Sequence, residues 1–446
     1  MSIDELENAV ARIIDDAQGG RADAVWSGVE ALLRTQRNEE MIALALVRIV
    51  EGGHLPIDRA LTVLADVYRA HSRNRRVIGL LGDALDKARD IAFLNASPPE
   101  DPLFLQVVST LTEMLETPQD VDMETQLLRG LSTAARMMAR QRDEVVERCG
   151  RRLIELDPSD ASRHYNFGLF LKTRGRFREG MFANQAGEDL LDGPPDDAYE
   201  WNLGICATGA GEDALALQVW KRLEQKIEMG RFELPEGRYP QCKVRLAQRP
   251  LAERSAAADD PGIEETIWIE RLSPCHGIIR SVLYQDLGID YGDVILFDGA
   301  PITYHTYGEE KVPVYPHLAT LLQRHYNFFD FAGTQEEAAQ ISDASADLEG
   351  DAIVYSHSEK FIRLCESCWR NPDINHHHDH EVDKRVVTGR IAAPGDMDVR
   401  DLLQQIDRAM AKREPCRIYM PNLCEAAGLL ERASFEKRRF EMITRR

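Results

Sequence analysis

The amino-acid sequence predicts a multidomain protein, with an N-terminal all-α helical-repeat solenoid followed by a mixed α+β domain that holds a small β-barrel or twisted sheet. Three observations predict this fold class. Apolar residues recur at helical spacing from the N-terminus to about residue 240. A spacing of glycines repeats within that region. A small, acidic segment rich in helix breakers, residues 255–262, then precedes a series of short strands.

The composition is that of an acidic globular protein. Its 446 residues carry 54 basic and 75 acidic side chains, a formal net charge of −21. This charge argues against nucleic acid as a partner, because phosphate-backbone binding relies on Lys and Arg. No stretch approaches the roughly 18 apolar residues of a membrane-spanning helix, and the acidic N-terminus does not resemble a signal peptide. The eight cysteines are too few for a disulfide framework. We therefore expect a cytoplasmic protein with no membrane contact.

Residues 1–124 are predicted to be helical, as degenerate repeats or as an unrelated helical bundle. Apolar residues recur at helical spacing over 6–14, 25–33 and 41–50, and glycine or proline pairs separate such stretches. Alternating apolar runs, which would indicate strands, are absent from this part of the sequence. A strand-poor region of this length folds as a bundle or as a solenoid.

Residues 125–240 are predicted to contain helical repeats. Gly168 is followed seven residues later by Gly175 and twelve residues later by Gly180, and the same spacing recurs 36 residues further on. We expect the outer small residues of each block where two helices cross closely, and the middle glycine in the turn between them. The spacing therefore predicts helical hairpins that follow one another along the chain.

This pattern resembles the tetratricopeptide repeat (TPR) family over roughly residues 125–230, about a quarter of the chain. The matching residues of the two units are Tyr165, Phe167, Gly168, Gly175, Phe177, Gly180 and Ala186, then Trp201, Leu203, Gly204, Gly211, Ala216 and Leu223. Gly180 stands where the family usually has alanine, and the 36-residue step is longer than the usual period. The resemblance implies a curved scaffold that binds a peptide or protein on its concave face. The alternative is that these helices only pack against the C-terminal domain.

Residues 241–262 are predicted to be a linker, and residues 263–446 an α+β C-terminal domain. Closely spaced short strands favour a small barrel or twisted sheet at the start of this domain. The expected strands are 267–269, 277–282, 294–297, 302–307 and the short edge piece 312–314. The Asp-Gly turn at 298–301 predicts a hairpin between the third and fourth strands.

The remainder of this domain is predicted to alternate helices with strands. We expect helices at 317–325, 334–348, 358–369, 399–412 and 429–444, and strands at 351–355, 385–392 and 416–420. Asp398 is the expected N-cap of the helix 399–412. The last sixteen residues carry six basic and three acidic side chains. We expect a solvated helix face there, and the alternative is a docking patch for an acidic partner.

Cys365, Cys368, His376 and His380 form a predicted metal site, with zinc as the expected ion. The two cysteines have C-x-x-C spacing, and the two histidines follow within twelve residues of Cys368. Thiolate and imidazole are the ligands of tetrahedral zinc sites. In the alternative, the cysteines pack against neighbouring residues of a helix and the histidine run is a polar loop.

Cys275 is the candidate for a catalytic nucleophile, with His305, His317 or His357 as its base. A thiol needs a base to become the reactive thiolate. The adjacent His276 is a poor choice, because neighbouring residues of a strand point to opposite faces. The alternative is a buried structural cysteine in a turn.

The leading functional hypothesis is a scaffold or adaptor that binds a protein or peptide through its helical repeats, with a C-terminal module stabilised by a metal. The alternative is an enzyme with a metal- or cysteine-dependent catalytic domain, residues 263–446, that the repeats recruit to its substrate. Nine of the twelve histidines and five of the eight cysteines lie beyond residue 262. The phosphate-loop, H-E-x-x-H and G-x-S-x-G motifs do not occur in the sequence.

Overall fold

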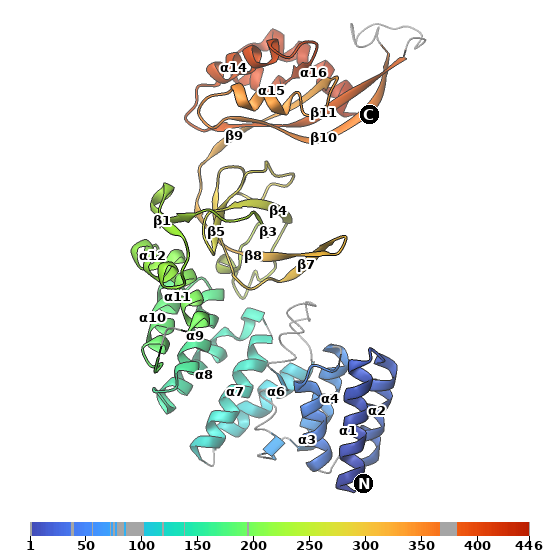
Figure 1. Ribbon diagram of the computed structural model, residues 1–446, viewed down its shortest axis with the longest axis vertical. Helices are drawn as coiled ribbons and strands as arrows, with labels where there is room; N and C mark the ends of the chain where they lie inside the picture. Colours follow the sequence, from blue (N-terminus) through green and yellow to red (C-terminus); the bar gives the residue numbers. More distant parts are fainter. Residues whose placement is uncertain are drawn as a thin grey trace. The chain divides into compact units, whose positions relative to one another are not determined.

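The chain folds into two compact units (Figure 1). The computed structural model describes residues 2–36, 40–55, 57–71, 73–74, 76–77, 84–85, 102–117, 120–137, 139–193, 196–365 and 381–445. Unit 1 comprises residues 1–235, 251–260 and 300–313, and unit 2 comprises residues 236–250, 261–299 and 314–446. Helices come first along the chain, and a mixed α+β part with a small barrel follows, which confirms the predicted fold class at this level.

Unit 1 is built from antiparallel helices, coloured blue to green in Figure 1. They are α1 (Ile3–Gln18), α2 (Ala22–Gln36), α3 (Glu40–Glu51), α4 (Ile57–His71), α6 (Pro102–Leu115), α7 (Val121–Met137), α8 (Asp143–Leu156), α9 (Ala161–Thr173), α10 (Phe177–Glu188), α11 (Asp197–Gly209) and α12 (Asp213–Arg222). One continuous apolar core runs from Leu6 in α1 to Leu171 in α9. No helix among the described residues has both the length and the apolar character needed to cross a membrane.

The predicted turn glycines lie where the sequence places them. Gly175 between α9 and α10 and Gly211 between α11 and α12 both have a φ of 72°, a left-handed conformation that glycine adopts without strain. Asp160 and Asp196 begin α9 and α11, since each carboxylate accepts a backbone N–H two residues later. Local sequence signals thus fix the start of each hairpin and the turn within it.

The small residues in the repeats allow close helix crossings, as the spacing predicts. A Cβ at Gly168 in α9 would lie 2.5 Å from the Asn184 side chain of α10. A Cβ at Gly204 in α11 would lie 2.5 Å from the Trp220 ring of α12. Because real Cβ atoms do not approach other atoms so closely, only glycine fits at either crossing.

The sequence predicts helical repeats up to residue 240, but the last helix of this region, α12, ends at Arg222. The strands β1 (Ile227–Met229) and β2 (Pro235–Gly237) follow α12. The predicted linker, 241–262, contains the strand β3 (Cys242–Ala247) and the short 3₁₀ helix η3 (Leu251–Glu253). Strands of three to six residues give too short a pattern to be detected beside long helices.

Part of the predicted linker folds back onto the helices of unit 1. The Arg140 guanidinium, only 6% exposed, donates to the Asp259 carboxylate at 3.0 Å and to the Thr173 carbonyl at 3.0 Å. It also donates to the Leu251 carbonyl. Burial lowers the pKa of Arg140, and the paired Asp259 acts in the opposite direction. Arg140 therefore attaches residues 251–260 to the helices of this unit.

The first part of unit 2 is a closed five-stranded barrel. Its strands follow the order β3, β4 (Glu264–Arg271), β5 (His276–Ile278), β6 (Val294–Phe297) and β8 (Glu310–Leu322), and β3 closes it by pairing in parallel with β8. The interior holds Val244, Ile269, Ile295 and Phe297. The small barrel expected from the sequence is therefore present.

Three expectations for the barrel are wrong. The predicted hairpin between 294–297 and 302–307 does not form, because β6 pairs with β5 and β8, and β7 (Thr303–Tyr307) lies beside β8 instead. The predicted edge piece 312–314 and helix 317–325 are instead one 13-residue strand, β8. Residues 316–318 of β8 are all buried, so the alternation of buried and less buried residues in the first half of this strand is interrupted there.

The second part of unit 2 is an antiparallel sheet with helices packed on it. The strand order is β10 (Ile353–Cys365), β11 (Glu381–Pro394), β9 (Tyr326–Gln335) and β12 (Arg417–Tyr419). The helices are α14 (Val399–Ala411), α15 (Pro421–Ala426) and α16 (Leu430–Thr444). Phe331, Val387 and Ile391 of the sheet share a core with Leu402 and Ile406 of α14.

Two of the predicted helices in this region are wrong. Residues 358–365 continue β10, because they pair with β11 up to Cys365 opposite Glu381. The predicted helix 334–348 is the end of β9 followed by a short 3₁₀ helix, η4 (Ser342–Asp347). Long-range pairing overrides the local helix preference of these residues. The N-cap at Asp398 is confirmed, because its carboxylate accepts the N–H groups of Arg400 and Asp401.

Candidate functional site

A cavity of about 320 Å³ opens between α7, α8 and α9 in unit 1. One face of α7 lines it with Thr125, Arg129, Ser132 and Arg136, which are spaced four, three and four residues apart. Residues of α8 and α9, with the N-cap residue of α9, line the remaining walls, namely Val146, Gly150, Leu153, Asp160, Ser162, Arg163, Asn166, Phe167 and Phe170. The cavity thus combines an apolar floor with a polar, arginine-rich rim.

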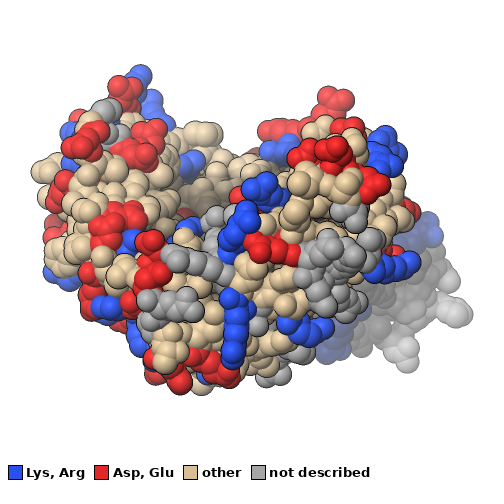
Figure 2. Space-filling view, turned by 90° about the horizontal axis from the view of Figure 1, so that it is seen from below, with Lys and Arg blue, Asp and Glu red and all other residues tan. Residues whose placement is uncertain are grey.

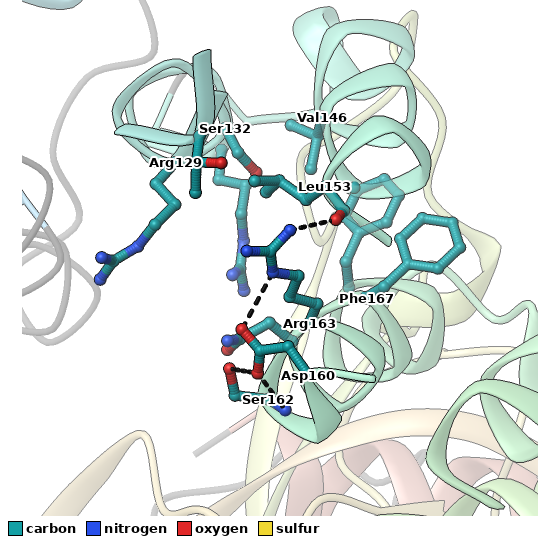
Figure 3. Close-up of a pocket in the computed structure, with 13 residues that line it drawn as sticks. Arg129, Ser132, Val146, Leu153, Asp160, Ser162, Arg163 and Phe167 are labelled. Atoms are coloured by element: carbon teal, nitrogen blue, oxygen red, sulfur yellow. Dashed lines mark hydrogen bonds and ion pairs between the residues drawn. The ribbon is translucent and has the colours of Figure 1, made fainter. Parts of the chain in front are cut away.

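Arg163 is held in place at one wall of this cavity, as Figure 3 shows. Its Nε donates to the Asp160 carboxylate at 2.9 Å, and its guanidinium also donates to the Leu153 carbonyl. Asp160 accepts two further hydrogen bonds, from the backbone N–H and the hydroxyl of Ser162. Burial alone would raise the pKa of Asp160, but these hydrogen bonds keep it below its ordinary value. The carboxylate therefore stays charged and orients Arg163.

The excess of positive charge in the cavity is a local feature. Three arginines line it, against one carboxylate, in a chain whose formal net charge is −21. Basic and acidic side chains are interspersed on the face shown in Figure 2. Guanidinium groups around a partly desolvated cavity favour a carboxylate or another anion.

Most of the predicted metal site lies outside the described residues. Cys368, His376 and His380 fall within 366–380, of which nothing is described. Cys365 is buried at the end of the strand β10, not on a helix as the sequence predicts. Across the described ranges, no group of three or more His, Cys, Asp or Glu side chains is arranged to hold a metal ion. The zinc site stays a prediction.

Cys275 and His357 make hydrogen bonds with different residues. Cys275 is fully buried, and its backbone N–H donates to the Ser273 hydroxyl at 3.1 Å. His357 on β10 lies 2.8 Å from the Val282 carbonyl through its Nε2, and its ring stacks on Tyr284. His305 is on β7, which belongs to unit 1. The described hydrogen bonds therefore do not join Cys275 to His357.

His276 is the histidine closest in sequence to Cys275, and it is bound to a different residue. Its Nδ1 lies 2.5 Å from the hydroxyl of Ser273, which also accepts the His276 backbone N–H at 3.0 Å. Burial lowers the pKa of His276 to about 3, so the ring is neutral at ordinary pH. This arrangement closes the turn that leads into β5.

A second cavity, of about 550 Å³, lies within unit 2 where the barrel meets the second sheet. Its lining comes from residues 284–293 between β5 and β6, from 323–330 around the start of β9, and from Arg390 on β11. No short motif contains these residues, so no sequence pattern indicates that they meet.

No protein-family model matches the chain, and no curated protein matches it. Solved structures that resemble it include a crystal structure of MamA, with 17% sequence identity and a TM-score of 0.30, over 42% of this chain and 90% of MamA. A MamA RS-1 double mutant has 16% identity and a TM-score of 0.29, over 40% of this chain and 87% of the mutant. TM-scores of this size do not support a conclusion about function.

Proposed function

We propose that this chain is a cytoplasmic protein-interaction scaffold whose TPR-like hairpins bind an acidic peptide segment of a partner protein at the cavity between α7, α8 and α9. The cavity itself carries the proposal. Its rim holds Arg129, Arg136 and Arg163, and its floor holds Phe167 and Phe170. Such a surface suits a segment with an acidic side chain beside an apolar one.

The helices supply a rigid base for such a site. The residues of α7 that line the cavity follow one helix face, and Arg163 is fixed by Asp160 at the first turn of α9. A preformed site loses little conformational entropy when a peptide binds. The C-terminal α+β unit then acts as a second binding or regulatory module.

The proposal is tested with an array of ten-residue peptides probed with the full-length chain. Each acidic peptide, with Asp or Glu beside Leu or Phe, is matched by a copy with Asn or Gln at the acidic positions. We expect the acidic set to bind. In fluorescence polarisation of the best binder, Arg136→Glu and Arg129→Glu each lower affinity by about tenfold or more, because each reverses a charge at the rim.

Arg34→Glu is the matched control, because Arg34 lies on α2, outside the cavity lining, and is 77% exposed. Circular dichroism checks that all three variants remain folded. Equal binding of acidic and amide peptides would contradict the proposal, as would unchanged affinity in both Arg129→Glu and Arg136→Glu.

A further inference from the structure

The cavity in unit 2 has the size of a small-molecule site. Its volume of about 550 Å³ falls within the range of ligand pockets in proteins, about 300–1,000 Å³. The barrel contributes the loop 284–293, and the sheet contributes β9 and β11. It shares no lining residue with the cavity of unit 1, so ligand binding here is independent of the proposed peptide binding.

Two aspartates are fixed at this cavity by backbone hydrogen bonds. Asp290 accepts the N–H groups of Leu283 at 2.9 Å and Tyr291 at 2.7 Å. Asp293 accepts the N–H groups of Arg324 at 2.7 Å and Asp290 at 3.0 Å. Burial raises the pKa of both carboxyl groups. A bound cation would therefore stabilise their charged forms.

The charge of the lining is negative even after its one arginine is counted. Four aspartates line the cavity, at positions 286, 290, 293 and 330. Arg390 donates to Asp290 at 3.0 Å, lies 3.9 Å from Asp330 and has its guanidinium 4.4 Å from the centre of the Phe328 ring. Its donors are therefore directed at groups of the protein itself, and the cavity keeps an excess of carboxylates.

Tyr326 supplies an independent indication of a ligand. It lines the cavity and is only 8% exposed, and its hydroxyl has no hydrogen-bond partner among the described residues. Its ring is held by an edge contact with Tyr291, at 5.3 Å between centres, and packs on Gly292. Buried hydroxyl groups in native proteins nearly always have a partner. A group in the cavity would provide one.

We propose that this cavity binds a small organic cation with a primary ammonium or guanidinium group. The cation donates a hydrogen bond to the Tyr326 hydroxyl oxygen and lies among the aspartates and aromatic rings of the lining. A divalent metal ion fits less well, because no three acidic, histidine or cysteine side chains converge on one point within the described part of the chain.

The test uses isothermal titration calorimetry of the full-length chain with putrescine and with agmatine, and succinate serves as an anion of similar size. We expect saturable binding of at least one cation and none of succinate. Tyr326→Phe keeps the ring and removes only the hydroxyl, so it lowers affinity about fivefold or more, while the melting temperature is unchanged or higher. Asp330→Asn lowers affinity by about threefold or more, since it removes a charge from the exposed rim.

Asp401→Asn is the matched control, because Asp401 is exposed on α14 and is not part of the lining. The proposal is overturned if neither cation binds at concentrations up to about 10 mM, or if succinate, magnesium or calcium binds instead. It is also overturned if Tyr326→Phe and Asp330→Asn both bind the cations as the unmodified chain does. None of these outcomes bears on the arginines of unit 1, so the peptide-binding proposal is tested separately.

Discussion

At the scale of single residues, the buried charged groups of unit 1 show how packing sets protonation. Glu200 in α11 is 1% exposed and is bound by Arg222 of α12 at 2.5 and 2.8 Å. Glu188 of α10 lies beside this pair, with its carboxylate 3.8 Å from the same guanidinium. One arginine thus serves two carboxylates, and the second is poorly compensated.

The pKa of Glu188 is raised in the folded chain, where this carboxylate shares Arg222 with Glu200. Burial raises it from 4.5 to about 7, and the hydrogen bond with Glu200 and the charge of Glu200 act in the same direction, while Arg222 opposes them. Between pH 4.5 and about 7, Glu188 holds a proton in the folded state that it has released in the unfolded state. The contribution of Glu188 to stability is therefore fully present below pH 4.5 and is lost as the pH rises through about 7.

Glu188→Gln is expected to remove this pH dependence, because glutamine stays neutral and keeps a hydrogen-bonding group beside Glu200. Urea unfolding at pH 5 and pH 8 measures the effect. The variant should match the unmodified chain at pH 5 and be more stable than it at pH 8. Glu228→Gln is the control, because Glu228 is 84% exposed. A variant that is less stable at pH 8 would show that Glu188 is charged and usefully paired there.

The predicted metal site and the cavity of unit 2 differ in how far apart their residues lie in the sequence. The spacing of Cys365 and Cys368 was visible in the sequence because both residues lie in one short segment. The cavity that holds Asp290, Tyr326 and Arg390 was not visible, because about a hundred positions separate its first and last residues. The Tyr326 hydroxyl, which has no hydrogen-bond partner among the described residues, can be recognised only once the fold is known.

At the scale of elements, the helical hairpins follow directly from local signals. The α9–α10 and α11–α12 hairpins each combine an Asp N-cap with a turn glycine of positive φ. The hydrogen bonds of a helix join residues four apart, so nearly all the determinants of such an element lie within it. This is why the turns at Gly175 and Gly211 could be predicted one by one.

Gly204→Ala tests the close crossing between α11 and α12. The new Cβ would lie 2.5 Å from the Trp220 ring, which is fully buried and has no room to move. We expect a loss of about 1–3 kcal/mol in the free energy of unfolding, measured by urea denaturation.

Gly130→Ala is the control for this crossing. Its Cβ would meet only the end of the Leu111 side chain at 3.3 Å, and alanine favours helix formation, so its stability should remain within about 1 kcal/mol of the unmodified chain. Equal effects of the two substitutions would mean that the α11–α12 crossing is not tight.

The strands β8 and β10 show where local signals fail. Leu318, Leu321 and Leu322 have helical spacing, yet they lie on a strand of the barrel. Glu359 and Lys360 favour a helix, yet they pair with Val387 and Val386 of β11. A strand is stabilised by partners far away in the sequence, so its own residues specify it incompletely.

At the scale of the whole molecule, the chain passes between its two units more than once. Residues 236–250 belong to unit 2, 251–260 to unit 1, 261–299 to unit 2 and 300–313 to unit 1. The predicted domain boundary at residue 262 therefore separates β3 from the barrel, although β3 is the strand that closes this barrel. β3 pairs with β4 on one side and with β8 on the other.

Because β3 lies before residue 263, we expect two C-terminal fragments to differ in how they unfold. The fragment 236–446 retains β3 and should unfold cooperatively. The fragment 263–446 lacks β3, which leaves the edges of β4 and β8 unpaired, so we expect aggregation or a broad, non-cooperative transition. Differential scanning calorimetry and size-exclusion chromatography distinguish the two results. Identical melting of both fragments would show that barrel closure contributes little to the stability of this unit.

Residues a few positions apart specify the helical hairpins and their turns, and they also indicate the strand-rich part that follows, so these features could be predicted before the fold was known. The tertiary structure alone decided how the barrel closes, that residues 310–322 and 353–365 are strands, and that the loop 284–293 meets β9 and β11 around a cavity. Contacts of that kind join distant parts of the chain, and they form only when the hydrophobic cores and sheet registers of the whole unit are satisfied together.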